Sequence, residues 1–416
     1  MKIAVWHNLP SGGGKRALYY HVRGLIERGH TVEAWCPPTA DRDYLPLGDI
    51  VREHVIPLNW RPRRTWSPAN RAWANYSNVV DKLHALDLHS RRCAHEMSIR
   101  GFDLLLANAD RDFMSPPIGR HAKIPAVLYL QEPLRTLYEA MPELPWSALP
   151  SPSRPSLPYA VRFFHNLIKL QGKRVMLREE RASATSFNTI LVNSLFSRES
   201  VLRAYGLDAE VCYLGVDSNI FRWEKLRREQ FVVGLGAFTP SKGVEFVIRA
   251  ISTMPEERPP LVWIGNAEQP GYIAEMEQLA SLLGVTFTPR LRLTDNELVL
   301  WLNRAGAMAY APRLEPFGFA PLEANACGLP VVATAEGGVR ETVINGVNGL
   351  LVKHNPKAMG AALSRLLDDP TFSSHLGETA RKWVEQEWSL AGAVERLESK
   401  LYATLAASGM DRTRAI

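Results

Sequence analysis

Short apolar runs alternate with amphipathic segments along the whole chain. Residues 2–6 form an apolar run that predicts a strand, and residues 15–28 have the apolar spacing of a helix, which Gly29 ends. A glycine-containing loop over 7–14 joins the two, and residues 31–35 predict a second strand. A strand–loop–helix–strand unit of this kind predicts a parallel sheet covered by helices.

The rest of the first half continues this alternation around two irregular stretches. Residues 61–71, rich in Arg, Trp and Pro, predict an irregular loop, and residues 142–158, with six prolines and four serines, predict a loop or lid. A basic helix follows over 159–186, and its apolar spacing favours packing against the first domain, with an interfacial membrane role as the alternative. The other expected elements are a helix over about 75–100 and strands over 102–108, 126–130, 189–193 and 211–214.

The pattern restarts after Asp217. It predicts strands over 231–235, 261–264, 307–310 and 330–334, and helices over 243–254, 273–283, 295–303, 357–369, 376–388 and 390–406. A chain of 416 residues is also too long for one ordinary core. We therefore expect an α/β protein with two domains, residues 1–216 and 217–388. In the remaining segment, 389–416, a helix returns to the first domain and a polar tail follows.

One apolar stretch of the second half carries two acids. Glu315 and Glu323 stand eight residues apart, and almost no other charge interrupts residues 316–335. Pro321 predicts the first position of a short helix that ends near Gly328. A helix N-terminus favours anions through its free N–H groups and its dipole. The stretch therefore predicts a site for a ligand that carries both phosphate and hydroxyl groups.

Composition indicates a globular protein of a reducing compartment. Hydrophobic residues make up 46% of the chain and charged residues 22%, which is typical of globular domains. No run approaches the roughly 18–20 apolar residues of a membrane span, and the first apolar run is too short for a secretory signal. The four cysteines are scattered without ligand spacing, as are the eleven histidines. We therefore expect a cytoplasmic protein without a structural metal.

Charge is unevenly distributed between the two halves. Residues 1–216 hold 28 Lys and Arg against 20 Asp and Glu, a net charge of +8, and the remaining 21 basic residues stand against 23 acidic ones, a net charge of −2. The basic half suits an anionic lipid surface or a phosphorylated substrate. It predicts peripheral contact with the inner face of a membrane, or else no particular partner; nucleic acid is not expected.

Several motifs point together to one family. Glu315 and Glu323, within Glu-Pro-Phe-Gly-Phe-Ala-Pro-Leu-Glu, match an E-x7-E signature, and residues 236–243 resemble a G-R-L-x3-K-G phosphate loop. Residues 330–334, 337–341 and 345–352 continue the match, as does the glycine run 12–14 in the first half. Nearly the whole chain thus resembles the retaining glycosyltransferases of glycosyltransferase family 4. Their fold, GT-B, has two Rossmann-like domains facing each other across a cleft.

The resemblance implies a role for each matched residue. Lys242 supplies positive charge to the donor diphosphate, Glu323 holds the ribose, and Glu315 contacts the sugar and stabilises positive charge at its anomeric carbon. No side chain stands out as a covalent nucleophile, so front-face substitution with retention is expected, without a metal or a cofactor beyond the nucleotide sugar. The expected catalytic residues are Glu315, Lys242 and Gln131. The expected donor-binding residues are Gly12, Gly13, Gly14, Lys242, Arg290, Leu291, Glu315, Phe317, Gly318, Phe319 and Glu323.

Two positions depart from the family's pattern. Ala237 stands where the family usually has an arginine, so one of two diphosphate cations is missing, and Arg290, Arg292 and Arg313 are the candidates to replace it. Gln131 occupies the place of a histidine that contacts the donor sugar. Glutamine can hydrogen-bond a hydroxyl but does not titrate near neutrality. The neighbouring Glu132 and Arg135 are candidates for the acceptor side.

Three other functions compete with this interpretation. Residues 12–17 fit G-x-G-x-x-[GA], with Glu33 at the distance of a nicotinamide-binding acid, but five residues separate Trp6 from Gly12 and weaken the dehydrogenase hypothesis. Two Asp-x-Asp triplets, 41–43 and 110–112, suggest a metal motif, although each is more simply a turn with charge pairing. A binding protein without catalysis is favoured by Ala237 and Gln131 and opposed by the two retained glutamates.

The substrates stay open at this stage. A GDP- or UDP-linked hexose is expected as donor, and the resemblance to enzymes of envelope polysaccharide assembly favours mannose. The acceptor is a hydroxyl of a glycan, a lipid-linked molecule or a small molecule. Neither the linkage nor the oligomeric state is indicated.

Overall fold

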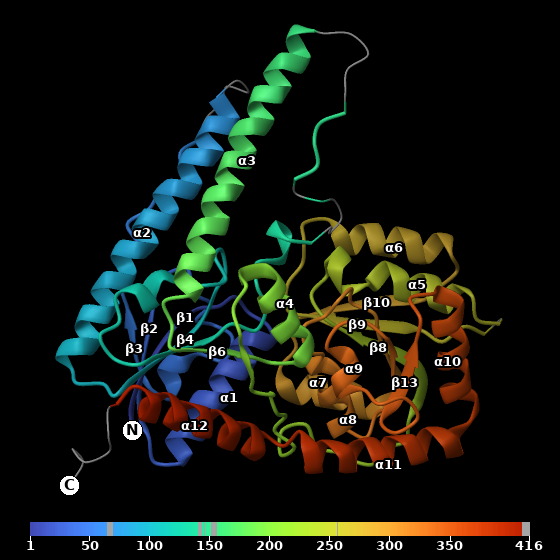
Figure 1. The fold of residues 1–416 in the computed structure, drawn as a ribbon. Coiled ribbons are helices and arrows are strands. Elements are labelled where there is room, and N and C mark those ends of the chain that lie inside the picture. Colours follow the sequence, from blue (N-terminus) through green and yellow to red (C-terminus); the bar gives the residue numbers. More distant parts are fainter. Residues whose placement is uncertain (65–69, 140–143, 145, 151–155, 256, 410–416) are drawn as a thin grey trace.

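Two parallel β-sheets, one in each half of the chain, are the framework of the computed structural model (Figure 1). The structure describes residues 1–64, 70–139, 144, 146–150, 156–255 and 257–409. The central strands of both sheets are mostly apolar and buried because helices cover both faces of each sheet. The predicted α/β class with two Rossmann-like domains is confirmed.

The first sheet has seven strands in the order β3-β2-β1-β4-β5-β6-β7, all paired in parallel. Its strands are β1 (Lys2–Asn8), β2 (Thr31–Cys36), β3 (Arg52–Val55), β4 (Leu104–Asp110), β5 (Ala126–Tyr129), β6 (Thr189–Val192) and β7 (Glu210–Val211). Its helices are α1 (Gly13–Glu27), α2 (Arg71–Ile99), α3 (Leu157–Ala184) and α4 (Leu195–Tyr205), with short 3-10 turns η1 (Leu47–Asp49), η3 (Pro117–Arg120) and η4 (Arg135–Leu137).

The second sheet has six parallel strands in the order β10-β9-β8-β11-β12-β13. Its strands are β8 (Glu229–Leu235), β9 (Leu261–Gly265), β10 (Phe287–Leu291), β11 (Ala305–Tyr310), β12 (Val331–Thr334) and β13 (Gly349–Val352). Its helices are α5 (Val244–Ser252), α6 (Tyr272–Leu282), α7 (Asp295–Arg304), α8 (Phe319–Ala326), α9 (Val339–Thr342), α10 (Pro356–Asp368) and α11 (Pro370–Glu387), and η5 (Pro240–Lys242) precedes α5.

The last helix, α12 (Leu390–Ala407), returns to the first domain, as predicted (Figure 1). A bridge between Val216 and Ser389 marks where the chain crosses back. The helix then packs against α1 so closely that a Cβ at Gly24 would lie 2.4 Å from Val394 Cγ2. Both domains are therefore fastened together behind the cleft by the C-terminal segment.

Several predicted boundaries are wrong, and five elements were not predicted. β3, β10 and β13 are short, and α4 and α9 lie in stretches without a clear helical period, so their patterns carry little signal. The strand expected over 211–214 shrinks to Glu210–Val211, and the helix expected at 376 begins at Pro370. The loop 61–71 is irregular through residue 64, and α2 begins at its last residue, Arg71. Within the proline-rich stretch 142–158, residues 142–143, 145 and 151–155 lie outside the described residues.

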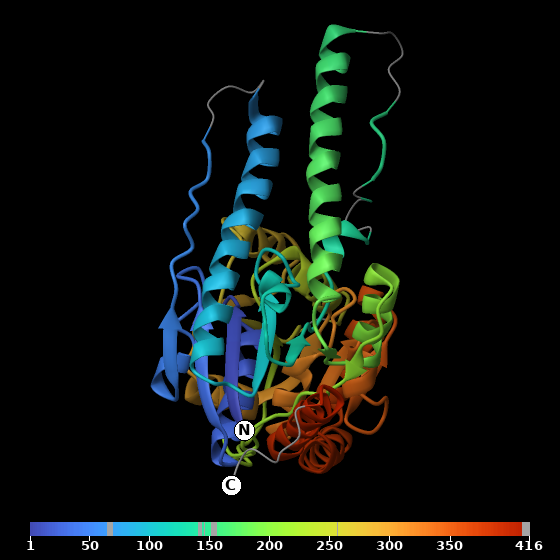
Figure 2. The ribbon, with the colours of Figure 1, turned by 60° about the vertical axis from the view of Figure 1, so that its left-hand side comes forward.

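Helices α2 and α3 project well beyond the first sheet, side by side, in both ribbon views (Figures 1 and 2). Both helices start at the projecting end and run down toward the sheet. Among the residues that the structure describes, no helix is long and apolar enough to cross a membrane.

Candidate active site

A cavity of about 540 Å³ lies between the two domains, at the carboxyl ends of strands from both sheets. Ligands of open α/β sheets bind at such ends, because the loops that follow the strands meet there. Both predicted acids line it, together with the glycine run and seven further charged residues. The charged lining residues are Arg16, Asp110, Arg111, Glu132, Arg135, Lys242, Arg313, Glu315 and Glu323.

The glycine run forms the first-domain wall of the cavity. Helix α1 begins at Gly13, two residues earlier than predicted, so Gly13 and Gly14 belong to its first turn and lie at the positive end of its dipole. The side chain of Gln131 packs against this turn, and a Cβ at Gly14 would lie 2.9 Å from Gln131 Oε1. Buried Gln131 Nε2 has no hydrogen-bond partner among the described residues. Gln131 thus offers a free amide donor to the cavity beside a helix N-terminus.

Lys242 and Glu315 form an ion pair on the opposite wall. Lys242 Nζ lies 2.8 Å from Glu315 Oε2 and 3.2 Å from Oε1. Burial alone would lower the pKa of Lys242, but the charge and hydrogen bond of Glu315 and the charge of Glu132 outweigh it, so the pKa is raised. Lys242 is therefore a fixed cation at neutral pH.

The loop that carries Glu315 is held by a second glycine pair. The backbone N–H of Gly338 donates to the Glu315 carbonyl oxygen at 2.8 Å. A Cβ at Gly337, whose φ is +59°, would lie 2.3 Å from that oxygen. The glycines matched at 337–338 therefore let α9 approach this loop closely and fix its course.

Helix α8 points its N-terminus into the same cavity, but it begins earlier than predicted. Its first residue is Phe319, and Gly318 precedes it with a φ of +93°. Pro321 is the third residue of the helix rather than the first, which is tolerated because N–H groups of the first turn lack an intrahelical partner. Phe317, Gly318, Phe319 and Glu323 all line the cavity.

Glu132 and Arg135 tie the first domain to the Glu315 loop. Arg135 Nη1 donates to the Leu314 carbonyl oxygen at 2.9 Å, and it also lies 3.5 Å from Glu132 Oε2. Burial raises the pKa of Glu132 to about 7 against the charges of Arg135 and Lys242, with Glu315 adding to the rise. Glu132 is therefore a carboxyl that titrates near neutrality.

Glu323 is paired with a residue that the sequence did not single out. Arg16, in the first turn of α1, brings Nε to 3.3 Å from Glu323 Oε1 and Nη2 to 2.5 Å from Asp295 Oδ1. Burial raises the pKa of Glu323 to about 7, which the Arg16 charge opposes and the Asp295 charge assists. The available signal for Arg16 was its place two residues after the glycine run, where a cation would face an anion site.

The three arginines that could replace the diphosphate cation missing at Ala237 lie in different places in the structure. Ala237 and Arg313 both line the cavity, and Arg313 Nε pairs with Glu336 Oε2 at 2.8 Å. The Arg290 guanidinium lies over the Trp301 ring, 5.6 Å from its centroid, and Arg290, Leu291 and Arg292 are not among the lining residues. Of the three candidates, Arg313 alone reaches the cavity within the described part of the chain.

The two Asp-x-Asp triplets are turns, as expected. Asp41 Oδ1 accepts from the backbone N–H groups of Asp43 and Tyr44, and Asp110 Oδ1 does the same for Asp112 and Phe113. Their carboxylates are thus used by the local backbone.

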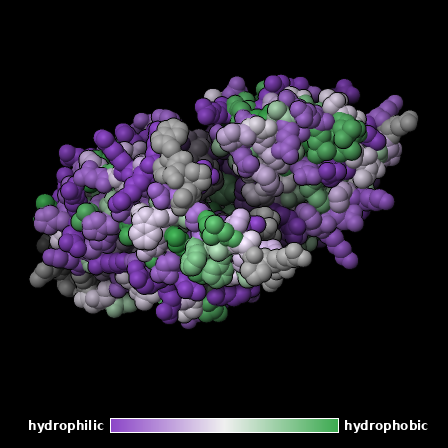
Figure 3. Space-filling model, turned by 90° about the horizontal axis from the view of Figure 1, so that it is seen from above, coloured by the Kyte–Doolittle hydropathy of each residue, from purple (hydrophilic) through white to green (hydrophobic). Residues whose placement is uncertain are grey.

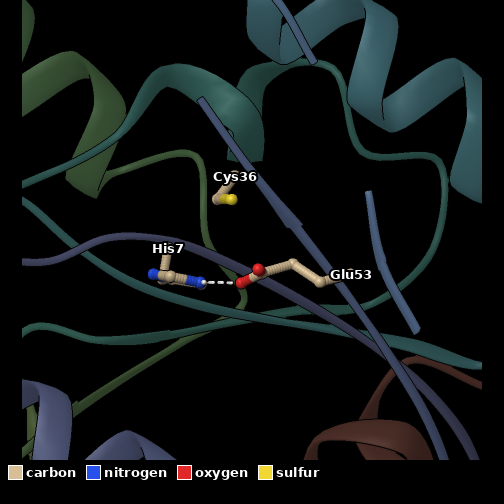
Figure 4. Close-up of side chains that lie close together, drawn as sticks. All are labelled: His7, Cys36 and Glu53. Carbon is tan, nitrogen blue, oxygen red and sulfur yellow. Dashed lines mark hydrogen bonds and ion pairs between the residues drawn. The ribbon is translucent and has the colours of Figure 1, made fainter. Parts of the chain in front are cut away.

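A largely buried polar cluster that the sequence did not predict lies on β1, β2 and β3 of the first sheet (Figure 4). His7, Cys36 and Glu53 each bring one possible metal-ligand atom within 4.8 Å of the others, and His7 Nε2 lies 3.2 Å from Glu53 Oε1. The fully buried Lys15 and nearby Arg42 place positive charge beside the same carboxylate. Burial, together with the Lys15 charge, lowers the pKa of His7. Two neighbouring cations already balance Glu53, so the donor set does not fit a divalent metal ion well.

Two family models match consecutive parts of the chain. "Glycosyltransferase Family 4" matches residues 11–219, and "Glycosyl transferases group 1" matches residues 216–383. A D-inositol 3-phosphate glycosyltransferase of Xylanimonas cellulosilytica is 30% identical over 238 residues, which are 51% of this chain and 55% of that protein. A protein of the same name from Thermobispora bispora is 31% identical over 49% of this chain and 54% of its own length. The chain thus spans about half the length of the curated relatives it matches.

Solved structures resemble the chain over nearly its whole length. HepE of Anabaena, in complex with UDP, is 20% identical, with a TM-score of 0.69 over 97% of this chain and 100% of that one. Sucrose-phosphate synthase from Thermosynechococcus elongatus is 18% identical, with a TM-score of 0.70 over 98% of this chain and 100% of that one. At these identities the likeness concerns the fold, two Rossmann-like domains across a cleft.

Proposed function

Because the chain belongs to glycosyltransferase family 4, we propose that it transfers a hexose from a UDP- or GDP-linked donor to an acceptor hydroxyl with retention of configuration. The observation that carries the proposal is the Lys242–Glu315 pair, which faces Gln131 and the α1 N-terminus across one cavity. A fixed cation, a carboxylate and free N–H groups converge there from two domains. Departure of a diphosphate from a sugar requires groups of these kinds, which stabilise the charges that develop as the bond breaks.

In this proposal the diphosphate lies between the N-termini of α1 and α8, beside Lys242. Lys242 provides a point charge, and the helix N-termini provide N–H dipoles that are already oriented. Arg313 takes the place of the arginine that the family usually has at position 237, since it lines the cavity and its side chain is paired there with the carboxylate of Glu336. These groups neutralise the leaving diphosphate without a metal ion, so transfer in the presence of EDTA is expected.

The sugar occupies the space between Glu315 and Gln131. As the bond from the anomeric carbon to the phosphate oxygen breaks, the acceptor oxygen bonds to that carbon on the same face. The leaving phosphate oxygen takes the hydroxyl proton, so no separate base is needed and configuration is retained. Glu315 stabilises the positive charge that develops on the carbon, and the Gln131 amide holds a sugar hydroxyl.

The names of similar proteins bear on the donor and the acceptor. HepE structures contain UDP, or UDP-glucose, and the curated relatives are named as glycosyltransferases of D-inositol 3-phosphate. These names favour a nucleotide-linked hexose, with glucose and mannose both among the donors to test. Glu132 and Arg135 face the acceptor, which is a glycan, a lipid-linked molecule or a small molecule.

Thermal-shift screening against UDP, GDP and ADP, and their sugars, tests the donor. At about 100 times Kd a ligand adds about 2.7 kcal/mol of stability, which raises the melting temperature of a chain of this length by about 3 °C. Transfer is then followed by NMR of the anomeric proton. A product with inverted configuration contradicts the front-face mechanism, and no shift with any nucleotide contradicts the donor site.

A binding protein of the same fold is the second candidate, because Ala237 and Gln131 both depart from the family's pattern. Glu315→Ala distinguishes the two. An enzyme loses turnover in this variant while its nucleotide affinity stays within a few-fold. If the unmodified protein neither transfers nor hydrolyses any nucleotide sugar that it binds, the binding function holds.

A further inference from the structure

The free ends of α2 and α3 form a projecting arm, which we define as residues 71–84 and 157–171. In these described residues no side chain is fully buried, whereas the lower halves of both helices pack onto the first domain. Figures 1 and 2 show both segments rising above the sheets. At about 1.5 Å per residue each segment extends for roughly 20 Å. An arm of this size is not needed to cover the first sheet.

The arm exposes large apolar side chains. Trp73 is 60% exposed, Phe164 is 62% exposed and Leu157 is 79% exposed. Further exposed apolar residues on the arm are Val80, Val161, Phe163 and Leu167. Figure 3 looks down on the free ends of the helices and shows hydrophobic surface beside hydrophilic surface there. Single exposed leucines are ordinary on a protein surface, but a cluster containing tryptophan and phenylalanine marks an interaction site.

The charges between these side chains are almost all positive. The arm carries Arg71, Arg162 and Lys169, and also Lys82, which is paired with Asp112 at 2.5 Å. Its one acid, Asp81, is paired with Arg63 at 2.7 Å. From residue 144 to residue 178 the sequence contains no Asp or Glu. Both helices also begin at the free end, so the positive ends of two helix dipoles lie there.

We propose that the arm docks into the surface of an anionic lipid bilayer. Its aromatic and aliphatic side chains enter the boundary between headgroups and acyl chains, and its Arg and Lys side chains pair with lipid phosphates. A second copy of the chain fits less well, since it would bring like charges together. The inference deepens the proposed function, and it rests on that function only where it assigns a lipid-linked acceptor to the cleft. Figure 3 shows the surface hollowed between the domains on the face from which the arm rises, so the cleft would open toward a lipid-linked acceptor.

Co-sedimentation of the full chain with vesicles tests the proposal. One set contains phosphatidylcholine alone, and the other contains phosphatidylcholine with phosphatidylglycerol. The apolar variant is Trp73→Ser with Phe164→Ser. Its matched control is Ile99→Ser with Leu282→Ser, because Ile99 is 71% exposed at the opposite end of α2 and Leu282 is 82% exposed on α6. All four positions are exposed, so both variants are expected to fold.

The unmodified chain should bind the anionic vesicles and release them at high salt. The apolar variant should partition at least tenfold more weakly, while the control stays within twofold. Arg162→Gln with Lys169→Gln should also weaken binding, by about fivefold for each charge. The same change at Lys353 and Lys357, exposed on the second domain, should leave binding intact.

Three results overturn the proposal. One is failure of the unmodified chain to sediment with anionic vesicles, and another is binding by the apolar variant at the unmodified level. The third is a dimer, seen by light scattering, that the apolar variant abolishes, because the occupant is then a second copy. Nucleotide-induced thermal shifts are measured on the same preparations. Vesicle binding without any shift refutes the donor site and leaves the arm's role standing.

Discussion

Replacing Lys242 with Met removes the cation of the candidate site while keeping a side chain of similar length. In the structure Lys242 Nζ lies 2.8 Å and 3.2 Å from the two Glu315 carboxylate oxygens. Glu132 adds a second acid to the same surroundings. The variant therefore loses a phosphate contact and also leaves the Glu315 charge unbalanced in the cavity.

The expected loss follows from these two effects. A hydrogen bond to a charged group contributes about 1.5–3 kcal/mol, which is about 10–150-fold in the dissociation constant of a nucleoside diphosphate. Charge that develops on the leaving group makes the contact stronger in the transition state, where losing one such donor costs about 10²–10³ in kcat. We therefore expect kcat/KM to fall by at least about 10³, with a measurable part of the loss in binding.

Calorimetric titration with the nucleoside diphosphate separates binding from turnover. Adding Glu315→Gln to Lys242→Met should restore part of the affinity, because it removes the carboxylate that then repels phosphate, while turnover stays lost. An affinity that recovers in the double variant while turnover stays lost is expected only if Lys242 and Glu315 contact each other. Lys357→Met, on the exposed face of α10, serves as control. The argument is refuted if Lys242→Met binds the diphosphate within twofold of the unmodified chain.

Three further outcomes are expected. Ala237→Arg should tighten diphosphate binding by about tenfold, since a charged contact exceeds the entropy lost by the side chain; unchanged or weaker binding would show that no phosphate comes near. Gly14→Ala should lower kcat/KM by displacing Gln131, whose Oε1 would lie 2.9 Å from the new Cβ, whereas a Cβ at Gly13 meets nothing within 4 Å, so Gly13→Ala should leave Gln131 in place. Burial raises the pKa of Glu180 from 4.5 to about 7, so its ionisation destabilises the fold as pH rises between those values. Glu180→Gln should therefore gain about 2–3 kcal/mol relative to the unmodified chain between pH 5 and pH 8 in chemical denaturation; a pH-independent difference would contradict the shift.

The sequence predicts the fold well because both sheets consist of buried parallel strands. Such strands are continuous apolar runs, bounded by glycine and alternating with helices, and this pattern is visible without knowing the neighbours. Boundaries are less predictable, since they depend on contacts across the fold. Helix α8 begins at Phe319 because Gly318 adopts a left-handed conformation beneath α9, where Thr342 Oγ1 would lie 2.9 Å from a Cβ.

The candidate site is predictable only where local motifs carry it. The motifs around Glu315, Lys242 and the glycine run indicate that these residues share one site, and the structure brings them to one cavity. Arg16 and Asp295 lie in no such motif. Each becomes part of the site only through its contact with the other domain, which the sequence does not show. The sequence also does not tell which of Arg290 and Arg313 reaches the cavity. Spacing along the chain gives no information about the direction in which a guanidinium points.

The pairing of Glu323 with Arg16 joins the two domains chemically as well as sterically. Burial raises the pKa of Glu323 to about 7, and the Arg16 charge opposes that rise. An ionised carboxylate accepts about four hydrogen bonds, so one contact with Arg16 Nε leaves acceptor positions for the ribose hydroxyls expected at Glu323. A protonated carboxyl would have fewer acceptor positions and an O–H to place. The second domain thus holds Glu323 in position, but the first domain supplies the charge that keeps it an acceptor. A site of this kind is complete only when Arg16 of the first domain contacts Glu323 of the second, and neither half of the sequence contains it alone.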